Sequence, residues 1–125
     1  MKIVNISFED TIPYQKMAKK EHVSFGNPIN AQWYGIYDDN VLVSFYCLVH
    51  KNKKVRFKSN YTVNYFRKRG CLQEFIEHAI SICKKIGVIS MTCFCTEMSY
   101  KSHIRHGAVL VSKKKTYYVK YNIGK

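Results

Sequence analysis

The period of the hydrophobic pattern changes at Gly70, and this change constrains the fold more than any other feature. Before Gly70, residues 32–37, 41–50 and 55–63 are apolar, aromatic and β-branched runs of the kind that forms strands. Short polar segments rich in turn residues separate these runs. Because such short connections join antiparallel neighbours, we expect three consecutive antiparallel strands.

After Gly70, apolar residues recur on one face at helical spacing from Leu72 to Ile86, and Gly87 ends the segment. The following run, residues 88–96, is rich in strand formers and too apolar for a half-exposed strand. The pattern therefore predicts a β-α-β unit whose second strand lies in the centre of the sheet.

Less regular segments complete the expected chain. A first strand over residues 2–8 precedes a helix that Asp10 or Thr11 can cap, with Met17 and Ala18 among its buried residues. The last elements are a short helix and a closing hairpin, at residues 97–106, 108–112 and 116–123.

The length of 125 residues leaves room for one compact domain, and 46% hydrophobic residues supply its core. We therefore expect a single domain over residues 1–125, of the α/β class, with a mixed, mostly antiparallel central sheet and flanking helices. No stretch has the length of a membrane span, and residues 1–6 do not resemble a signal peptide. The five cysteines are odd in number and lie in apolar segments, which predicts reduced thiols and a cytoplasmic location. Cys93 and Cys95 have no second pair at zinc spacing, so no metal site is expected.

The charge balance is strongly basic. Lys and Arg number 21 against 8 Asp and Glu, a formal net charge of +13, which favours anionic partners such as nucleic acid or phosphorylated cofactors. Most of these cations are Lys, and the chain is also rich in Asn, Ile and Tyr, so part of the excess can reflect AT-rich coding.

Chemistry concentrates at residues 60–72, where a strand ends, a basic loop turns and a long helix begins at a glycine. The first N–H groups of a helix have no partner within it and lie at its positive end, so a pyrophosphate can accept hydrogen bonds there. Gly70 allows close approach of the backbone, and Arg67, Lys68 and Arg69 add cations. The alternative from these residues alone is a solvated basic loop before an amphipathic helix.

The sequence Arg67-Lys68-Arg69-Gly70-Cys71-Leu72 resembles the pyrophosphate loop of the GNAT acyltransferases, Arg/Gln-x-x-Gly-x-Gly/Ala. Residues 96–108 resemble the Asn-x-x-Ala-x-x-x-Tyr-x-x-x-Gly-Phe block of the same family, and the resemblance covers residues 34–121. The chain departs from the pattern at Leu72, Lys68, Thr96 and Ala108, where the family usually has Gly or Ala, Gly, Asn and Phe.

The resemblance implies the GNAT fold and transfer of an acyl group from acetyl-CoA, the cosubstrate, to an amine. It implies cofactor binding by the basic loop, the strand before it and the start of the short helix. The residues expected to bind the cofactor are Thr62, Val63, Arg67, Lys68, Arg69, Gly70, Cys71, Leu72, Thr96 and Ser99.

His103 falls where many family members carry a Tyr that protonates the leaving thiolate, and an imidazole can do this near neutral pH. The other interpretation of His103 is a surface helix residue. Residues 55–60 contain no carboxylate to act as a base. Either a water relay through Ser59, a backbone carbonyl or His103 serves, or the acceptor amine is already neutral.

The acceptor is left open among a small amine, a protein lysine and a nucleic-acid group. The net charge favours a nucleic-acid-associated acceptor, because it repels a diffusing polycation and attracts a polyanion. Small, basic, phage-type members of this fold include the Mom-like proteins that modify DNA. The alternative function is therefore a non-catalytic or Mom-like DNA-modifying GNAT-fold protein that binds nucleic acid.

Overall fold

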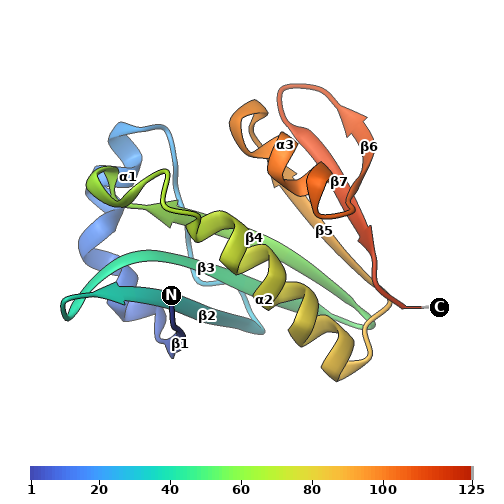
Figure 1. Ribbon diagram of the computed structural model, residues 1–125, viewed down its shortest axis with the longest axis horizontal. Coiled ribbons are helices and arrows are strands. Elements are labelled where there is room, and N and C mark those ends of the chain that lie inside the picture. The colour runs from blue at the N-terminus through green and yellow to red at the C-terminus, as the bar shows by residue number, and fades with distance from the viewer. Residues whose placement is uncertain (125) are drawn as a thin grey trace.

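A computed structural model describes residues 1–124. The seven strands found in these residues form one sheet, in the order β1-β2-β3-β4-β5-β7-β6, and all neighbours except β4 and β5 are antiparallel (Figure 1). The predicted α/β class with a mostly antiparallel sheet is confirmed. The prediction of a single domain over residues 1–125 stays a prediction, and Lys125 lies outside the described residues. The strands are β1 (Ile3–Ile6), β2 (Ala31–Asp38), β3 (Val41–Lys51), β4 (Lys54–Thr62), β5 (Ser90–Cys95), β6 (Val109–Lys113) and β7 (Tyr117–Asn122).

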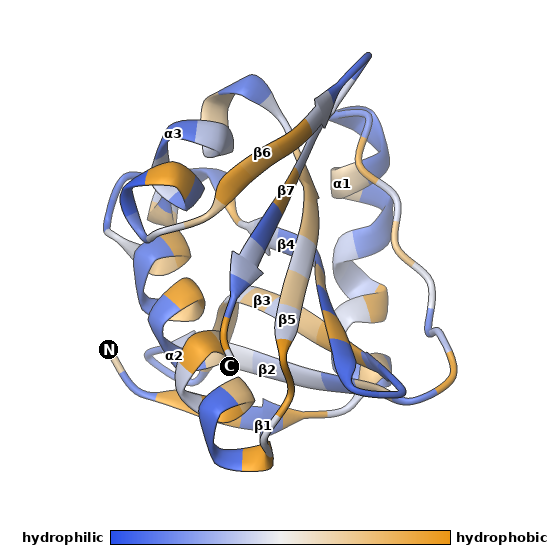
Figure 2. Ribbon diagram, turned by 90° about the vertical axis from the view of Figure 1, so that its right-hand side faces the viewer, coloured by the Kyte–Doolittle hydropathy of each residue, from blue (hydrophilic) through white to orange (hydrophobic). Residues whose placement is uncertain are grey.

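Helices cover the two faces of the sheet unequally. The α-helices are α1 (Gln15–Lys20), α2 (Cys71–Ile86) and α3 (Glu97–Arg105), and two 3-10 helices, η1 (Phe8–Tyr14) and η2 (Asn64–Phe66), complete the set. In Figure 2, α2 and α3 lie on one side of the sheet and α1 on the other. In the described part of the chain, no helix lies on the side of β5, β6 and β7 that faces away from α3 (Figure 2).

The predicted meander of three strands is confirmed as β2, β3 and β4. Asp39 and Asn40, between β2 and β3, have φ values of 51° and 66°, the left-handed conformation that tight hairpin turns require and that Asp and Asn tolerate. The β5 strand is central, between β4 and β7, as its apolar sequence predicts.

The long helix α2 begins and ends as the sequence indicates. Gly70 is its N-cap and Gly87 its C-cap, both with positive φ. Its inner face buries Phe75, Ile76 and Ala79 completely against the sheet, which fixes the crossover between β4 and β5.

The first helical segment differs from the prediction. Ser7, not Asp10 or Thr11, starts it through a capping box with Asp10, and the first turns are 3-10 rather than α. Met17, which the pattern assigns to the core, is 46% exposed. Ala18 is the residue of α1 that is buried.

The five cysteines are all free and buried, as expected for core thiols. None of the helices in residues 1–124 is both long enough and apolar enough to cross a membrane.

Candidate functional site

A cavity of about 270 Å³ lies where β4 ends and α2 begins. Its walls come from the end of β4, the loop after it, the first turn of α2 and the α3 helix. Most of the residues that the basic-loop motif predicted are among the lining residues, which are Thr62, Phe66, Arg67, Lys68, Gly70, Cys71, Leu72, Gln73, Met98 and Ser102.

The amino end of α2 faces this cavity. Gly70, at φ +87°, turns the chain into the helix, and its carbonyl accepts the first helical hydrogen bond, from the Glu74 amide at 3.1 Å. The amides of Cys71, Leu72 and Gln73 precede that bond and have no acceptor within the helix. They form a cluster of donors at the positive end of the helix dipole, next to Arg67 and Lys68.

Arg67 is held in place by groups from two distant parts of the chain. Its Nε donates to the Thr62 carbonyl at 2.9 Å, and its Nη2 forms an ion pair with Glu21, which follows α1. The Tyr61 hydroxyl also donates to Glu21, at 3.0 Å. The hydrogen bond from Arg67 lowers the pKa of Glu21 below its ordinary value. Glu21 is a functional candidate that the motif did not reveal, because it lies far from the loop in sequence.

Four of the predicted cofactor residues do not line the cavity. Val63 is buried in the core, and Arg69 places its guanidinium over the Phe66 ring at 4.8 Å. Thr96 caps α3 by accepting a hydrogen bond from the Ser99 amide at 3.4 Å, so both of these polar residues act within the helix end. Their binding roles stay predictions.

Two residues of α3, Met98 and Ser102, line the cavity, although neither is a predicted site residue. Met98 is 93% exposed and Ser102 is buried, and both line the cavity wall opposite α2. They are four residues apart and so lie on one face of the helix. The helical period counted from the Thr96 cap could have identified this pair, whereas the family motif points only to Thr96 and Ser99.

The β4 and β5 strands part beside this site. They pair over only four positions, from Lys54 with Ser90 to Phe57 with Cys93, and then diverge (Figure 1). The cause is a bulge at Ser59, which has φ +60° and shifts the register between β3 and β4. Within residues 1–124, no strand pairs with the edge of β4 beyond the bulge on the β5 side. The Ser59 Oγ is buried beside the Cys47 thiol.

His103 lies in the core and not on the surface of α3. Its side chain is 1% exposed, packs against the Phe57 ring and shares a 2.7 Å hydrogen bond between Nδ1 and the Tyr121 hydroxyl. Burial lowers the pKa of His103 to about 4, so the imidazole is neutral at pH 7. The interpretation as a surface helix residue is wrong. The role of His103 as the acid stays a prediction. Two observations count against it: the ring is neutral at pH 7, and it does not line the cavity.

Two other histidines have structural partners. His106 Nδ1 donates to the Ser102 carbonyl at 2.8 Å and so stabilises the carboxyl end of α3. The helical pattern places His78 on the solvated face of α2, but this residue is half-buried and hydrogen bonded to the Tyr46 hydroxyl at 2.7 Å. The α2 helix turns His78 toward the aromatic core rather than toward solvent.

No protein-family model matches the chain, and no curated protein matches it. Solved structures do match. The ribosomal-protein-S18-alanine N-acetyltransferase from Escherichia coli has a TM-score of 0.86 at 8% identity, over 99% of this chain and 94% of that one. The chain has the GNAT fold. A GNAT-family acetyltransferase from Staphylococcus aureus matches with a TM-score of 0.79 at 12% identity, over 98% of each chain. An aminoglycoside 6'-N-acetyltransferase complexed with coenzyme A matches with a TM-score of 0.80 at 9% identity, over 100% of this chain and 98% of that one.

The GNAT fold explains why the loop and the parting strands lie together. The β4-α2-β5 crossover brings the amino end of α2 to the same end of the sheet at which β4 and β5 diverge. A helix end with free amide donors and an unpaired strand edge are therefore adjacent. Together they can hold an extended ligand that has a polyphosphate at one end and amide groups along its length.

Proposed function

We propose that this protein is an N-acyltransferase that takes its acyl group from acetyl-CoA and passes it to an amine. The observation that carries the proposal is the cavity at the amino end of α2, beside the unpaired edge of β4. Coenzyme A combines a pyrophosphate with a pantetheine arm of two amides, and these two groups suit the two halves of this site. That the fold is shared with acetyltransferases, one of them crystallised with coenzyme A, adds support.

The pyrophosphate would be bound by the free amides of Cys71, Leu72 and Gln73. Arg67 and Lys68 would neutralise its charge from the side, since both line the cavity. Leu72 stands where the family has Gly or Ala, but its contribution here is a backbone amide, which any residue other than proline supplies.

The pantetheine arm would lie along β4 between Thr62 and the bulge, where it can pair with backbone groups. This places the thioester near Ser59, whose hydroxyl lies buried beside the Cys47 thiol. An amine nucleophile must lose a proton to attack the thioester. We assign the removal of this proton to a water relay through Ser59, because residues 55–60 contain no carboxylate.

Departure of the thiolate needs little help, because the pKa of a free thiol is about 8.5. We propose that His103 assists it by donating a hydrogen bond to the thiolate, because the ring is neutral at pH 7 and a neutral imidazole N–H is too weak an acid to give up its proton. The His103→Ala variant is then expected to keep CoA binding and to lose at most about a hundredfold in rate. A rate equal to that of the unmodified protein would remove His103 from the mechanism.

The acceptor we favour is an amine carried by a nucleic-acid-associated molecule, ahead of a protein lysine, because the net charge of +13 attracts polyanions. We also propose a cytoplasmic location, since all five thiols are free and buried.

The decisive test is calorimetric titration of CoA into the Gly70→Glu variant, with Gly87→Glu as the matched control. Both glycines flank α2 at positive φ, +87° and +77°, so both substitutions strain the backbone alike. Only the first adds a carboxylate beside the cavity, since Gly70 lines it.

We expect Gly87→Glu to bind CoA like the unmodified protein and Gly70→Glu to lose binding by at least about tenfold, through repulsion of the pyrophosphate at close range. Equal CoA affinity in the two variants would contradict the site. Absence of CoA binding to the unmodified protein would contradict the proposed function itself.

A further inference from the structure

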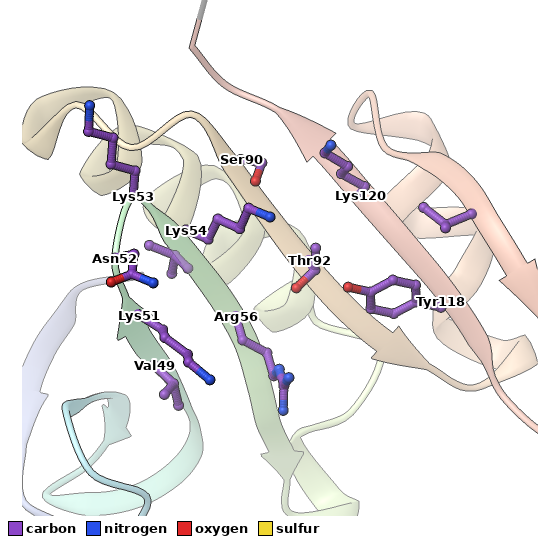
Figure 3. Close-up of a pocket in the computed structure, with 12 residues that line it drawn as sticks. Val49, Lys51, Asn52, Lys53, Lys54, Arg56, Ser90, Thr92, Tyr118 and Lys120 are labelled. Carbon is purple, nitrogen blue, oxygen red and sulfur yellow. The ribbon is translucent and has the colours of Figure 1, made fainter.

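A second and larger cavity, of about 990 Å³, lies on the opposite face of the sheet from α2 and α3. Side chains alternate between the faces of a strand, so Lys54 and Arg56 on β4 point away from the buried Val55 and Phe57. Figure 3 shows the lining side chains in front of the sheet, with the helices behind it. This is the face of β5 and β7 that no helix covers.

The walls of this cavity carry only positive charge. Five cations line it, from the end of β3, the β3–β4 turn, β4 and β7, and no Asp or Glu is among the lining residues. Figure 3 shows Lys54 reaching toward β5, and Lys51 and Arg56 extending to the same side, whereas Lys53 points away from them. None of these side chains forms an ion pair within residues 1–124. The five cations are Lys51, Lys53, Lys54, Arg56 and Lys120.

An aromatic pair adjoins these cations. Phe94 lies on the same face as Thr92, is 57% exposed and has its ring centroid 4.5 Å from that of Tyr118. The Arg56 guanidinium lies 5.9 Å from the centroid of the Phe94 ring. The exposed ring of Phe94, next to Tyr118 and these cations, offers a surface on which a flat π-system can stack.

A buried hydroxyl group supports the presence of a ligand. Ser90 lines the cavity, is 2% exposed, and its Oγ has no hydrogen-bond partner among residues 1–124. Buried polar atoms in native proteins almost always have a partner. Thr92 and Tyr118 add two more hydroxyl groups to the same wall (Figure 3).

We propose that this basic face, defined by Lys51, Lys54, Arg56, Lys120 and Phe94, binds single-stranded nucleic acid. The cations neutralise backbone phosphates, and Phe94 with Tyr118 offers a stacking platform for an unpaired base. A duplex keeps its bases stacked inside and gains nothing from such a platform. An acidic peptide would meet the same cations but would leave the aromatic pair unused.

The location relates this face to the acyl-transfer site. The face covers the paired part of β4 and β5, and the two strands diverge directly beyond it. A strand of nucleic acid bound here would lie on the opposite face of the sheet from the cofactor cavity. It would still be close to the proposed position of the thioester, because both lie near the point where β4 and β5 diverge. That the bound strand is the acyl acceptor rests on the proposed function, whereas the binding itself does not.

The test is fluorescence anisotropy with labelled single-stranded DNA and RNA of about ten nucleotides, a length in the range of one compact binding module, over a salt series. The face variant combines Lys51→Gln, Lys54→Gln, Arg56→Gln and Lys120→Gln. The control variant loses the same four charges elsewhere, through Lys84→Gln, Lys85→Gln, Lys114→Gln and Lys115→Gln. All four control residues are exposed, at the carboxyl end of α2 and in the β6–β7 turn.

We expect the unmodified protein and the control variant to bind with similar, salt-dependent affinity. The face variant should lose most of this affinity, and the slope of log K against log salt should fall by about 0.7 for each phosphate contact removed. Phe94→Leu should weaken binding of the single strand about tenfold and leave the salt slope unchanged. DNA and RNA binding equally would fit recognition through phosphates and base stacking.

Three results would overturn the proposal. One is equal loss of affinity in the face and control variants, which would indicate unspecific attraction by net charge. Another is tighter binding of a duplex than of the single strand, with no effect of Phe94→Leu. The third is equal affinity for polyglutamate, which would make the face a site for acidic protein. Calorimetric titration of CoA into the same variants separates the two proposals, because failure of CoA binding leaves the oligonucleotide result intact.

Discussion

At the scale of single residues, Arg67 connects the candidate site to the first helical segment. It is the only cation of the basic loop that has an ion-pair partner within residues 1–124, and this partner is Glu21. Both side chains are more than a third exposed, so the pair adds less than about 1 kcal/mol to stability. Its larger expected effect is on the charge that the pyrophosphate of the proposed cofactor would meet.

We predict that Glu21→Gln binds CoA more tightly, by up to about fivefold at low salt, because the charge of Arg67 is no longer offset. Calorimetry at two salt concentrations measures this effect, with Glu9→Gln on η1 as a control of equal charge change. The Arg67 hydrogen bond lowers the pKa of Glu21, so the pair stabilises the fold above the unfolded pKa of Glu21, and this contribution disappears as pH falls through the folded value. Weaker CoA binding in Glu21→Gln would mean that Glu21 positions Arg67 rather than competing for it.

His103 makes a second prediction possible at this scale. Its pKa is about 4 in the folded protein and about 6.5 in the unfolded chain, so the unfolded state binds more protons between these values. Stability from this group is therefore complete above pH 6.5 and is lost as pH falls toward 4. From pH 7 to pH 5 the loss is about 2 kcal/mol.

Urea unfolding at pH 7 and pH 5 checks this, with His103→Gln as the comparison because an amide can keep the contact with Tyr121 and does not titrate. We expect the variant to lose about 2 kcal/mol less than the unmodified protein over that interval. An equal pH dependence in both proteins would show that His103 is not held neutral.

At the scale of elements, substitution of Thr96 can decide whether this residue only caps the amino end of α3 or also binds the cofactor. Thr96 accepts the Ser99 amide, and the helix it starts carries the cavity residues Met98 and Ser102 as well as His103. Loss of this cap would therefore disturb both the cavity wall and the position of His103.

We predict that Thr96→Ala lowers the free energy of unfolding by about 1 kcal/mol, whereas Thr96→Ser keeps it, because serine retains the capping oxygen. Chemical denaturation measures both. CoA titration then separates a cap from a cofactor ligand: equal CoA affinity in the folded alanine variant would exclude Thr96 from cofactor binding.

At the scale of the whole molecule, the two candidate sites use the two faces of one sheet. The helix-covered face carries the cavity at the amino end of α2, and the open face carries most of the cavity-lining cations. Their separation means that a ligand at one site need not displace a ligand at the other, and the net charge of +13 favours anionic ligands at both.

We predict that CoA at a concentration of about one hundred times its Kd raises the free energy of unfolding by about 2.7 kcal/mol. For a chain of this size this corresponds to a rise in Tm on the order of 10 °C. Differential scanning calorimetry measures it, and the Gly70→Glu variant should show almost no rise. An equal rise in Gly70→Glu would place the CoA site elsewhere on the molecule.

The order of the elements and the candidate loop follow from the sequence, because both depend on local properties. The hydrophobic period, the left-handed glycines at the ends of α2 and the turn at Asp39 and Asn40 involve neighbours in the chain. For the same reason the cluster of Arg67, Lys68 and Gly70 in front of a helix indicates a phosphate site from the amino-acid sequence by itself.

The tertiary structure alone decided which distant residues meet. The packing of the segment after α1 brings Glu21 to Arg67, and the face of α3 that packs on the sheet turns His103 into the core. The register of β4, β5 and β7 collects Arg56, Thr92 and Lys120 on one open face. These meetings depend on strand pairing and on the bulge at Ser59, and a shift of one residue would reverse every side chain to the other face. Such a shift leaves the local sequence pattern unchanged, so only the three-dimensional structure could determine it.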